Sequence, residues 1–191
     1  VRVQLGTYTL SDNVENLVYT GTSAFAGTGN AVANKINGAS GNDTIDGGGG
    51  VDILTGGAGG DTFVFVGRQA DGDKIVDFAG ANDGGADKLL FKGYGTGATI
   101  KQVGTTDFYV ITADAAHGGF VETIQIAGER ALAVSDYTFA KDSGTVPNAA
   151  PTAINLSKTT VAENAASGSV IATLSAIDPD VGDKITFQLL D

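Results

Sequence analysis

Three aspartates recur at a fixed spacing of nine residues in the most glycine-rich part of the chain. Asp43, Asp52 and Asp61 occupy the same position in three consecutive nonapeptides that span residues 38–64. Carboxylates and backbone carbonyls are the oxygen ligands that calcium takes, and glycine allows the left-handed backbone that turns carbonyls toward an ion. A flexible linker would not keep an aspartate and an apolar residue at a fixed phase. The pattern therefore indicates oxygen-based cation binding.

The residues between the aspartates predict the elements that position them. The last three residues of each unit suffice for a very short strand with an inward middle side chain, and the six before it form a turn. Two units then make one coil, so we expect Ile36 and Leu54 to stack on one sheet and Ile45 and Phe63 on the other. Same-side turns would lie about 4.8 Å apart. A calcium ion with ligands at about 2.3–2.6 Å fits between them.

The repeat resembles the RTX (hemolysin-type) nonapeptide G-G-x-G-x-D-x-U-x, whose units build a calcium-binding parallel β-roll. Residues 29–37 are similar to a degenerate fourth copy, with Asn34 in the aspartate position. In the family, an ion takes carbonyls from positions one and three of one turn and from two and four of the turn two repeats later. The resemblance implies a central ion held by Asp43 and Asp61 with the carbonyls of Gly38, Ser40, Gly57 and Gly59.

Two further ions follow from the same resemblance. The second would be weaker because Asn34 is neutral, and its implied ligands are Asp52, Gly48, Gly50, Gly29, Ala31 and Asn34. For the third, Gly47 and Gly49, or Gly56, Ala58 and Asp61, would face the capping acids Asp73 and Asp77. The family also has an Asp-Lys-hydrophobic segment after the last repeat, here starting at Asp87. An insertion around residues 82–85 lengthens the gap before it, so a joint metal role for Asp77 and Asp87 stays open.

Charge and composition limit the classes of function that the chain can have. The formal net charge is −11, from 22 acidic and 11 basic residues, which argues against nucleic acid as a partner. Nine aspartates lie between Asp43 and Asp87. Two carboxylates about 4 Å apart repel by roughly 4 kcal/mol at an effective dielectric constant near 20, so we expect this region to resist compaction until a cation arrives. The chain has no cysteine, and metal ligation is the substitute for disulfides that remains.

Other classes of function find little support in the sequence. No apolar run approaches the length of a membrane span, and no signal peptide opens the chain. His117 is the one histidine, and no nucleophile signature accompanies it. The spacing of the aspartates suits stacked turns rather than a glycosidase pair. The absence of methionine predicts that these residues are a processed or excised piece of a longer protein.

The predicted fold class is all-β. Residues 1–92 are expected to form the parallel β-roll, with degenerate N-terminal coils, and 93–144 an antiparallel β cap. Residues 145–151 read as a linker. Residues 152–191 resemble the first part of a cadherin-like sandwich, although they are too few for a whole domain. In that family the matching acids bind calcium near the domain junction; here they are Glu163, Asp178 and Asp180, which are equally compatible with ordinary turn carboxylates.

Together these features predict a noncatalytic, calcium-binding structural or adhesion module of a large secreted or surface-displayed bacterial protein. The resemblance implies type I secretion, with the chain loose inside the cell and folding outside on calcium. One alternative is an auxiliary module of a secreted protease, lipase or polysaccharide-modifying enzyme. Another is a cap that binds a glycan or cell-surface ligand through the rings of Tyr94, Phe108, Tyr109 and Tyr137.

Overall fold

The computed structural model describes residues 1–83, 86–128, 131–141, 153–156 and 174–177. The chain divides into two compact units, Val1–Pro147 and Asn148–Asp191, and the division falls within the linker predicted at 145–151. The described residues are almost entirely strands, with three short 3-10 helices, η1 (Ala81–Asp83), η2 (Ala115–His117) and η3 (Val134–Asp136). Among them, no helix is long and apolar enough to cross a membrane.

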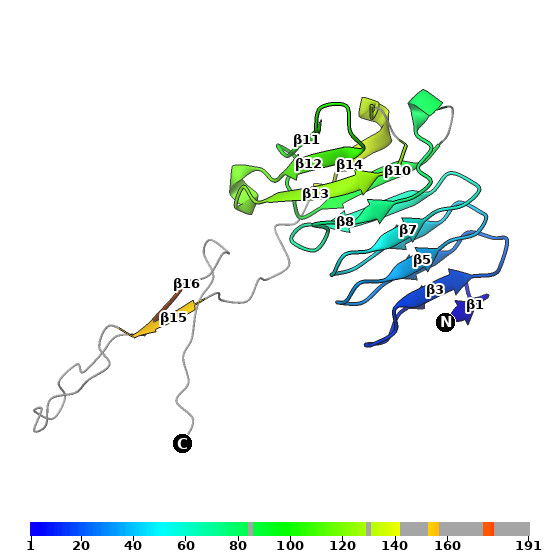
Figure 1. Cartoon of the computed structure of the whole chain (residues 1–191), viewed down its shortest axis with the longest axis horizontal. Coiled ribbons are helices and arrows are strands. Elements are labelled where there is room, and N and C mark those ends of the chain that lie inside the picture. Colours follow the sequence, from blue (N-terminus) through cyan, green and yellow to red (C-terminus); the bar gives the residue numbers. More distant parts are fainter. Residues whose placement is uncertain (84–85, 129–130, 142–152, 157–173, 178–191) are drawn as a thin grey trace, which may run out of the picture. The chain divides into compact units, whose positions relative to one another are not determined.

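The first unit is built from two sheets (Figure 1), and strands β1 to β10 alternate between them along the chain. The eight-stranded sheet has the order β1-β3-β5-β7-β9-β13-β12-β11. Its strands are β1 (Arg2–Val3), β3 (Asn16–Tyr19), β5 (Lys35–Asn37), β7 (Ile53–Thr55), β9 (Lys74–Ile75), β13 (Val121–Ile126), β12 (Phe108–Thr112) and β11 (Thr99–Gln102). Pairing is parallel from β1 to β13 and antiparallel between β13, β12 and β11.

The six-stranded sheet has the order β14-β10-β8-β6-β4-β2 and is parallel throughout. Its strands are β2 (Thr7–Thr9), β4 (Ala26–Thr28), β6 (Thr44–Asp46), β8 (Thr62–Val66), β10 (Lys88–Lys92) and β14 (Tyr137–Phe139). Successive coils of the chain therefore add one strand to each sheet in turn. This is the β-roll architecture that the nonapeptides predicted.

The core of the roll consists of single side chains that stack in a row between the two sheets. In each three-residue repeat strand the middle residue is buried and its neighbours are not. Ile36 pairs in register with Leu54 on the eight-stranded sheet, and Ile45 pairs with Phe63 on the six-stranded sheet, which confirms the predicted stacking. All four side chains are fully buried. Each coil thus contributes very few core residues.

The cap continues both sheets of the roll. The sequence predicted an antiparallel cap over 93–144, and β11 to β13 do form an antiparallel meander. However, β13 pairs in parallel with β9, and β14 pairs in parallel with β10. The outer edges of β9 and β10 would otherwise expose unpaired backbone groups, and these pairings cover them.

Two of the four rings considered for glycan stacking belong to the core of this cap. Tyr94 is 0% and Tyr109 is 2% exposed, so neither ring can stack on a ligand. The Tyr94 hydroxyl donates a hydrogen bond to Glu122 Oε2, and Glu122 Oε1 accepts one from the Ala70 N–H at 3.1 Å. These bonds tie β13 to the segments that follow β8 and β10. Phe108, by contrast, is 43% exposed.

In the second unit, β15 (Ala153–Leu156) pairs antiparallel with β16 (Leu174–Ile177). Glu163, Asp178 and Asp180 lie outside the described residues, as does the whole of 145–151. The cadherin-like resemblance therefore stays a prediction.

We expect Leu54→Ala to destabilise the first unit by about 2–5 kcal/mol, because it empties a site between Ile36 and Ile75. Ile53→Ala is the matched control, since Ile53 is the neighbouring residue and points outward, with 41% of its surface exposed. Urea unfolding in excess calcium measures both. Equal losses from the two substitutions would contradict the proposed inward and outward faces.

Candidate metal centre

Each repeat aspartate links two successive coils through one of its oxygens. Asp61 Oδ1 accepts the N–H of Asp43 at 2.8 Å, and Asp43 Oδ1 accepts the N–H of Phe25 at 2.9 Å. On the other side of the roll, Asp52 Oδ1 accepts the N–H of Asn34 at 2.7 Å. Each of these bonds joins residues eighteen apart in sequence. We call these stacked side chains, together with the acids that continue them, the carboxylate ladder.

The second oxygen of each repeat aspartate has no partner. Asp43 Oδ2, Asp52 Oδ2 and Asp61 Oδ2 are buried and form no hydrogen bond. Buried polar atoms in native proteins are almost always paired, and the exceptions call for an explanation such as an ion. Three equivalent exceptions at the three repeat positions indicate that this oxygen is positioned for a cation.

Glycine keeps the space beside these oxygens open. A Cβ atom on Gly38 would lie 2.3 Å from Asp43 Oδ2 and 2.7 Å from the carbonyl oxygen of Gly56. A Cβ atom on Gly56 would lie 2.2 Å from Asp61 Oδ2. The first glycine of a repeat therefore borders the unpaired carboxylate oxygen of its own repeat. The Cβ position of Gly38 also borders the carbonyl oxygen of Gly56, which belongs to the turn stacked next to it.

Backbone carbonyls of the two stacked turns are free to complete the central site. The turns 38–43 and 56–61 are joined by hydrogen bonds from Gly41 N to Ala58 O at 2.8 Å and from Ala58 N to Ala39 O at 3.0 Å. Within the described part of the chain, no hydrogen bond ends on the carbonyls implied as ligands, those of Gly38, Ser40, Gly57 and Gly59. The turn-to-turn bonds thus use other carbonyls and leave these four for an ion.

The second site differs because Asn34 is satisfied by the protein. Its Oδ1 accepts the N–H of Asn30 at 2.7 Å, and its Nδ2 donates to the Val14 carbonyl at 3.1 Å. A Cβ atom on Gly29 would lie 1.9 Å from the Gly47 carbonyl oxygen and 2.4 Å from Asn34 Oδ1, so the turn is as tightly packed as the central one. Asp52 supplies the one unpaired carboxylate oxygen here, consistent with a weaker site.

The capping acids extend the ladder, and Asp77 is hydrogen bonded on both of its oxygens. Asp73 Oδ1 accepts the N–H of Asp52 at 2.8 Å. Asp77 accepts from both Gly56 N, at 3.0 Å, and Gly57 N, at 2.8 Å. These contacts place both acids against the turns that they were predicted to face. Their role as metal ligands stays a prediction.

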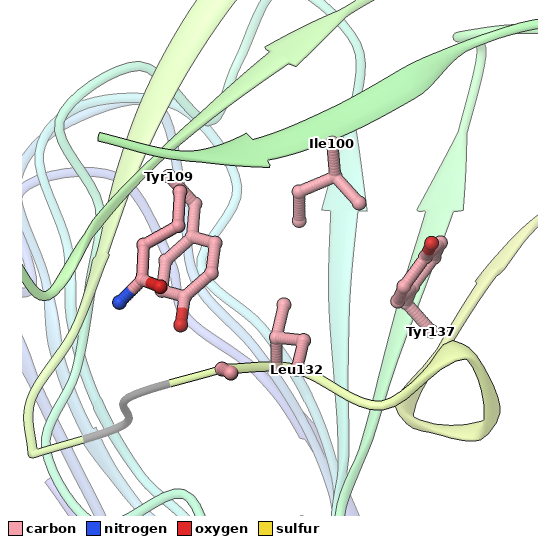
Figure 2. A pocket seen from close by; sticks show the side chains of 6 residues that line it. Ile100, Tyr109, Leu132 and Tyr137 are labelled. Carbon is pink, nitrogen blue, oxygen red and sulfur yellow. The ribbon is translucent and has the colours of Figure 1, made fainter. Parts of the chain in front are cut away.

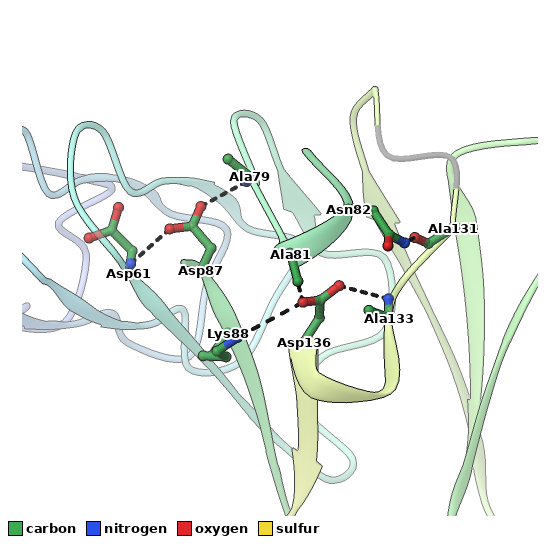
Figure 3. A network of polar contacts seen from close by, with 9 residues as sticks. All are labelled: Asp61, Ala79, Ala81, Asn82, Asp87, Lys88, Ala131, Ala133 and Asp136. Atoms are coloured by element: carbon green, nitrogen blue, oxygen red, sulfur yellow. Dashed lines mark hydrogen bonds and ion pairs between the residues drawn. The ribbon is translucent and has the colours of Figure 1, made fainter. Parts of the chain in front are cut away.

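Asp87 and Asp136 continue the ladder into the cap (Figure 3). Asp87 accepts the N–H groups of Asp61 at 2.8 Å and Ala79 at 2.9 Å, one on each oxygen. Asp136 is fully buried and accepts the N–H groups of Ala81 and Ala133 at 2.9 and 2.7 Å. Both oxygens of these two carboxylates are thus engaged by the protein. The unpaired carboxylate oxygens that could bind a metal ion therefore belong to the repeat aspartates.

Asp136 was not singled out from the sequence. The available signal was its place directly before β14, which matches Asp61 before β8 and Asp87 before β10. Outside the glycine-rich repeats, a place directly before a strand does not by itself identify an acid of the ladder. The strand with which β14 pairs is set by the tertiary fold and not by the local sequence. The side chain also lies 3.9 Å from Lys88 Nζ, which offsets its charge.

Burial makes the repeat carboxylates costly to ionise without a cation. Desolvation is the largest cause, and it raises the pKa of both Asp43 and Asp52 to about 6, against the opposing effect of the backbone N–H bonds. It raises the pKa of Asp73 to about 8, with the Asp52 and Glu122 charges adding to the shift. The pKa of Asp61 is also raised by burial. A bound cation would supply the missing countercharge.

Side chains alone do not form a metal site. Among the described residues there is no group of three or more His, Cys, Asp or Glu side chains that could hold an ion. Carbonyl oxygens must therefore provide most of the ligands. This donor set of few carboxylates and several carbonyls suits calcium, which takes six to eight oxygens in flexible geometry.

Comparison with family models finds a match over the repeats. Residues 28–63 match the family model of the RTX calcium-binding nonapeptide repeat in four copies. This segment of the chain consists of RTX repeats. No curated protein matches the chain. Among solved structures, the AlgE6R3 subunit of the Azotobacter vinelandii mannuronan C5-epimerase is similar, with 22% identity, a TM-score of 0.44, and coverage of 72% of this chain and 86% of that one.

A separate small cavity lies at the cap, away from the RTX turns (Figure 2). Its volume is about 160 Å³, and its lining comprises Ile100, Gln102, Tyr109, Ala131, Leu132 and Tyr137. Figure 2 shows Tyr137 and Leu132 across the cavity from the β11 and β12 side chains. No acidic side chain lines it, so it has no part in the metal centre.

We expect Gly56→Ala to lower calcium affinity and to remove at least one binding event, because its methyl group would occupy the space beside Asp61 Oδ2. Gly49→Ala is the matched control: a Cβ atom there meets nothing closer than 3.6 Å. Isothermal titration with calcium measures both variants. Normal binding by Gly56→Ala would show that the ion does not use this space.

The raised pKa values predict an inverted pH dependence for the calcium-free protein. Asp43, Asp52 and Asp73 have folded pKa values of about 6 to 8 against an ordinary value of 3.8, so the folded state binds more protons in that window. Stability should therefore fall as the pH rises from about 4 to 8. Thermal melts in calcium-free and calcium-saturated buffers test this. A calcium-free melting temperature that rises over that range would contradict the assignment.

Proposed function

We propose that this chain is a noncatalytic calcium-binding module whose β-roll is completed by ions between its turns. The observation that carries the proposal is the set of buried, unpaired Oδ2 atoms of Asp43, Asp52 and Asp61. They recur at the repeat positions, beside glycines that admit no side chain. The central ion is held by Asp43 and Asp61, and a second, weaker one by Asp52.

Calcium would act on folding by mass action. Extracellular calcium modules commonly bind with dissociation constants of about 10⁻⁴–10⁻³ M, so these sites would be largely empty where free calcium is far lower. An ion at one hundred times its dissociation constant adds about 2.7 kcal/mol of stability per site. We therefore propose that the chain is unfolded while it is exported by type I secretion. It then folds outside the cell as part of a secreted or surface adhesin.

His117 forms part of a hydrogen-bonded turn in the cap. Its Nδ1 lies 2.6 Å from Asp114 Oδ1, and the same carboxylate caps the short helix η2 by accepting the His117 N–H at 3.1 Å. The second Asp114 oxygen accepts the Gly97 N–H at 3.2 Å. The histidine hydrogen bond holds the pKa of Asp114 below its usual value. This pair is explained by turn formation alone.

The decisive experiment replaces the two central carboxylates by amides of the same shape. Asp43→Asn with Asp61→Asn keeps the Oδ1 bonds of the ladder and removes the charge. We expect the loss of at least one calcium-binding event by calorimetry, and a lower melting temperature that appears only when calcium is present. Asp12→Asn with Glu15→Gln is the control, because both side chains are exposed and the change in charge is the same. Unchanged binding in the Asp43/Asp61 variant would refute the site.

A further inference from the structure

The outward face of the eight-stranded sheet carries no acidic residue. The eight strands contain a single acid, Glu122, and its side chain is buried on the inward face of β13. Four outward positions are basic, namely Arg2, Lys35, Lys74 and Lys101. In a chain with twice as many acidic as basic residues, this separation is unexpected. It defines a surface that we call the basic face.

The cations of the basic face are evenly spread. Arg2, Lys35 and Lys74 lie on β1, β5 and β9, which are second neighbours in the sheet, so successive charges are about 10 Å apart across the strands. Lys35 and Lys74 share one row, because both pair in register with Ile53. Lys101 extends the charge to β11 at the far edge. The result is a line of separated charges rather than a compact cluster.

Neutral hydrogen-bonding and apolar side chains fill the space between the charges. Asn16 lies beside Lys35 in the same row, and Gln125 lies beside Lys74. The next position in that row is Phe108, whose ring is 43% exposed. Figure 1 shows these strands following one another along one side of the roll. The face thus offers amide groups and one aromatic ring within reach of its cations.

Acids lie only at the margins of this face: Glu15 directly precedes β3 with an exposed side chain, whereas Asp107 and Asp71 are hydrogen bonded. Asp107 Oδ2 accepts a hydrogen bond from Gln125 Nε2 at 2.7 Å, and Asp71 Oδ1 accepts the Thr123 N–H at 2.8 Å. The implied calcium ligands are turn residues outside these strands. The basic face is therefore separate from the metal centre in both residues and chemistry.

We propose that the basic face binds an extended acidic polysaccharide. Carboxylates spaced along a sugar chain complement the separated cations, hydroxyl groups suit the amides, and the apolar side of a sugar ring can pack on Phe108. Nucleic acid fits poorly, because its phosphates are far more closely spaced than the cations of this face. Since the ligand is held by spaced charges at an exposed surface, binding is weak and sensitive to salt.

The test uses the full chain in saturating calcium and a hyaluronan oligosaccharide, which carries a carboxylate on alternate sugars. Dextran of similar length is the neutral probe, and phosphatidylserine vesicles are the lipid probe. Lys35→Glu with Lys101→Glu reverses two exposed cations of the face. Lys92→Glu with Lys141→Glu is the control, with the same change in net charge at exposed positions outside the face. Circular dichroism and calcium titration verify that both variants fold.

We expect the parent chain to bind hyaluronan but not dextran, with an affinity that falls as salt is added. The Lys35/Lys101 variant should bind about tenfold more weakly or not at all, whereas the control variant binds like the parent. The proposal is overturned if the parent does not bind hyaluronan, if both variants lose affinity equally, or if only the vesicles bind. Because no implied calcium ligand lies on this face, such a failure would leave the calcium titration unchanged.

Discussion

The structure depends on aspartate carboxylates in which one oxygen is hydrogen bonded and the other has no partner. In each RTX turn, the Oδ1 atom of the aspartate accepts a backbone N–H from the preceding coil, and the same geometry buries Oδ2 without a partner. An unsatisfied buried polar group costs about 1–3 kcal/mol, and a charged one more. Three such groups are a large share of a domain stability of about 5–15 kcal/mol. The proposed calcium ions would neutralise these groups and so favour closure of the coils.

Calcium dependence should be confined to the repeats. Each repeat coil buries single side chains such as Ile36 and Ile45, so the hydrophobic core there is thin. The cap has a different basis: its rings pack together, as Phe91 does with Tyr94 and Phe139, and its ladder acids are satisfied by backbone N–H groups. The cap can therefore stay ordered at lower calcium and serve as the platform on which the coils stack.

Negative and positive side chains also lie in different parts of the roll. The turns collect the aspartates, because calcium requires negative ligands there, while the exposed surface of the eight-stranded sheet has only cations and neutral groups. Once ions occupy the turns, much of the local negative charge is compensated, and the basic face is left with a stronger net attraction for anions. In this view calcium has two effects, since it orders the sheet and removes the field that would repel an acidic ligand.

Much of this protein was predictable from local sequence. The nine-residue period determined the strand length, the alternation between sheets, the Ile36–Leu54 and Ile45–Phe63 pairs and the acids of the turns, because each depends on residues within one or two repeats. The tertiary structure decided the rest: the parallel docking of β13 and β14, the burial of Tyr94 and Tyr109, the place of Asp136 in the ladder and the acid-free face. These features join segments that are far apart in the chain and have no common period, so only the folded register brings them together.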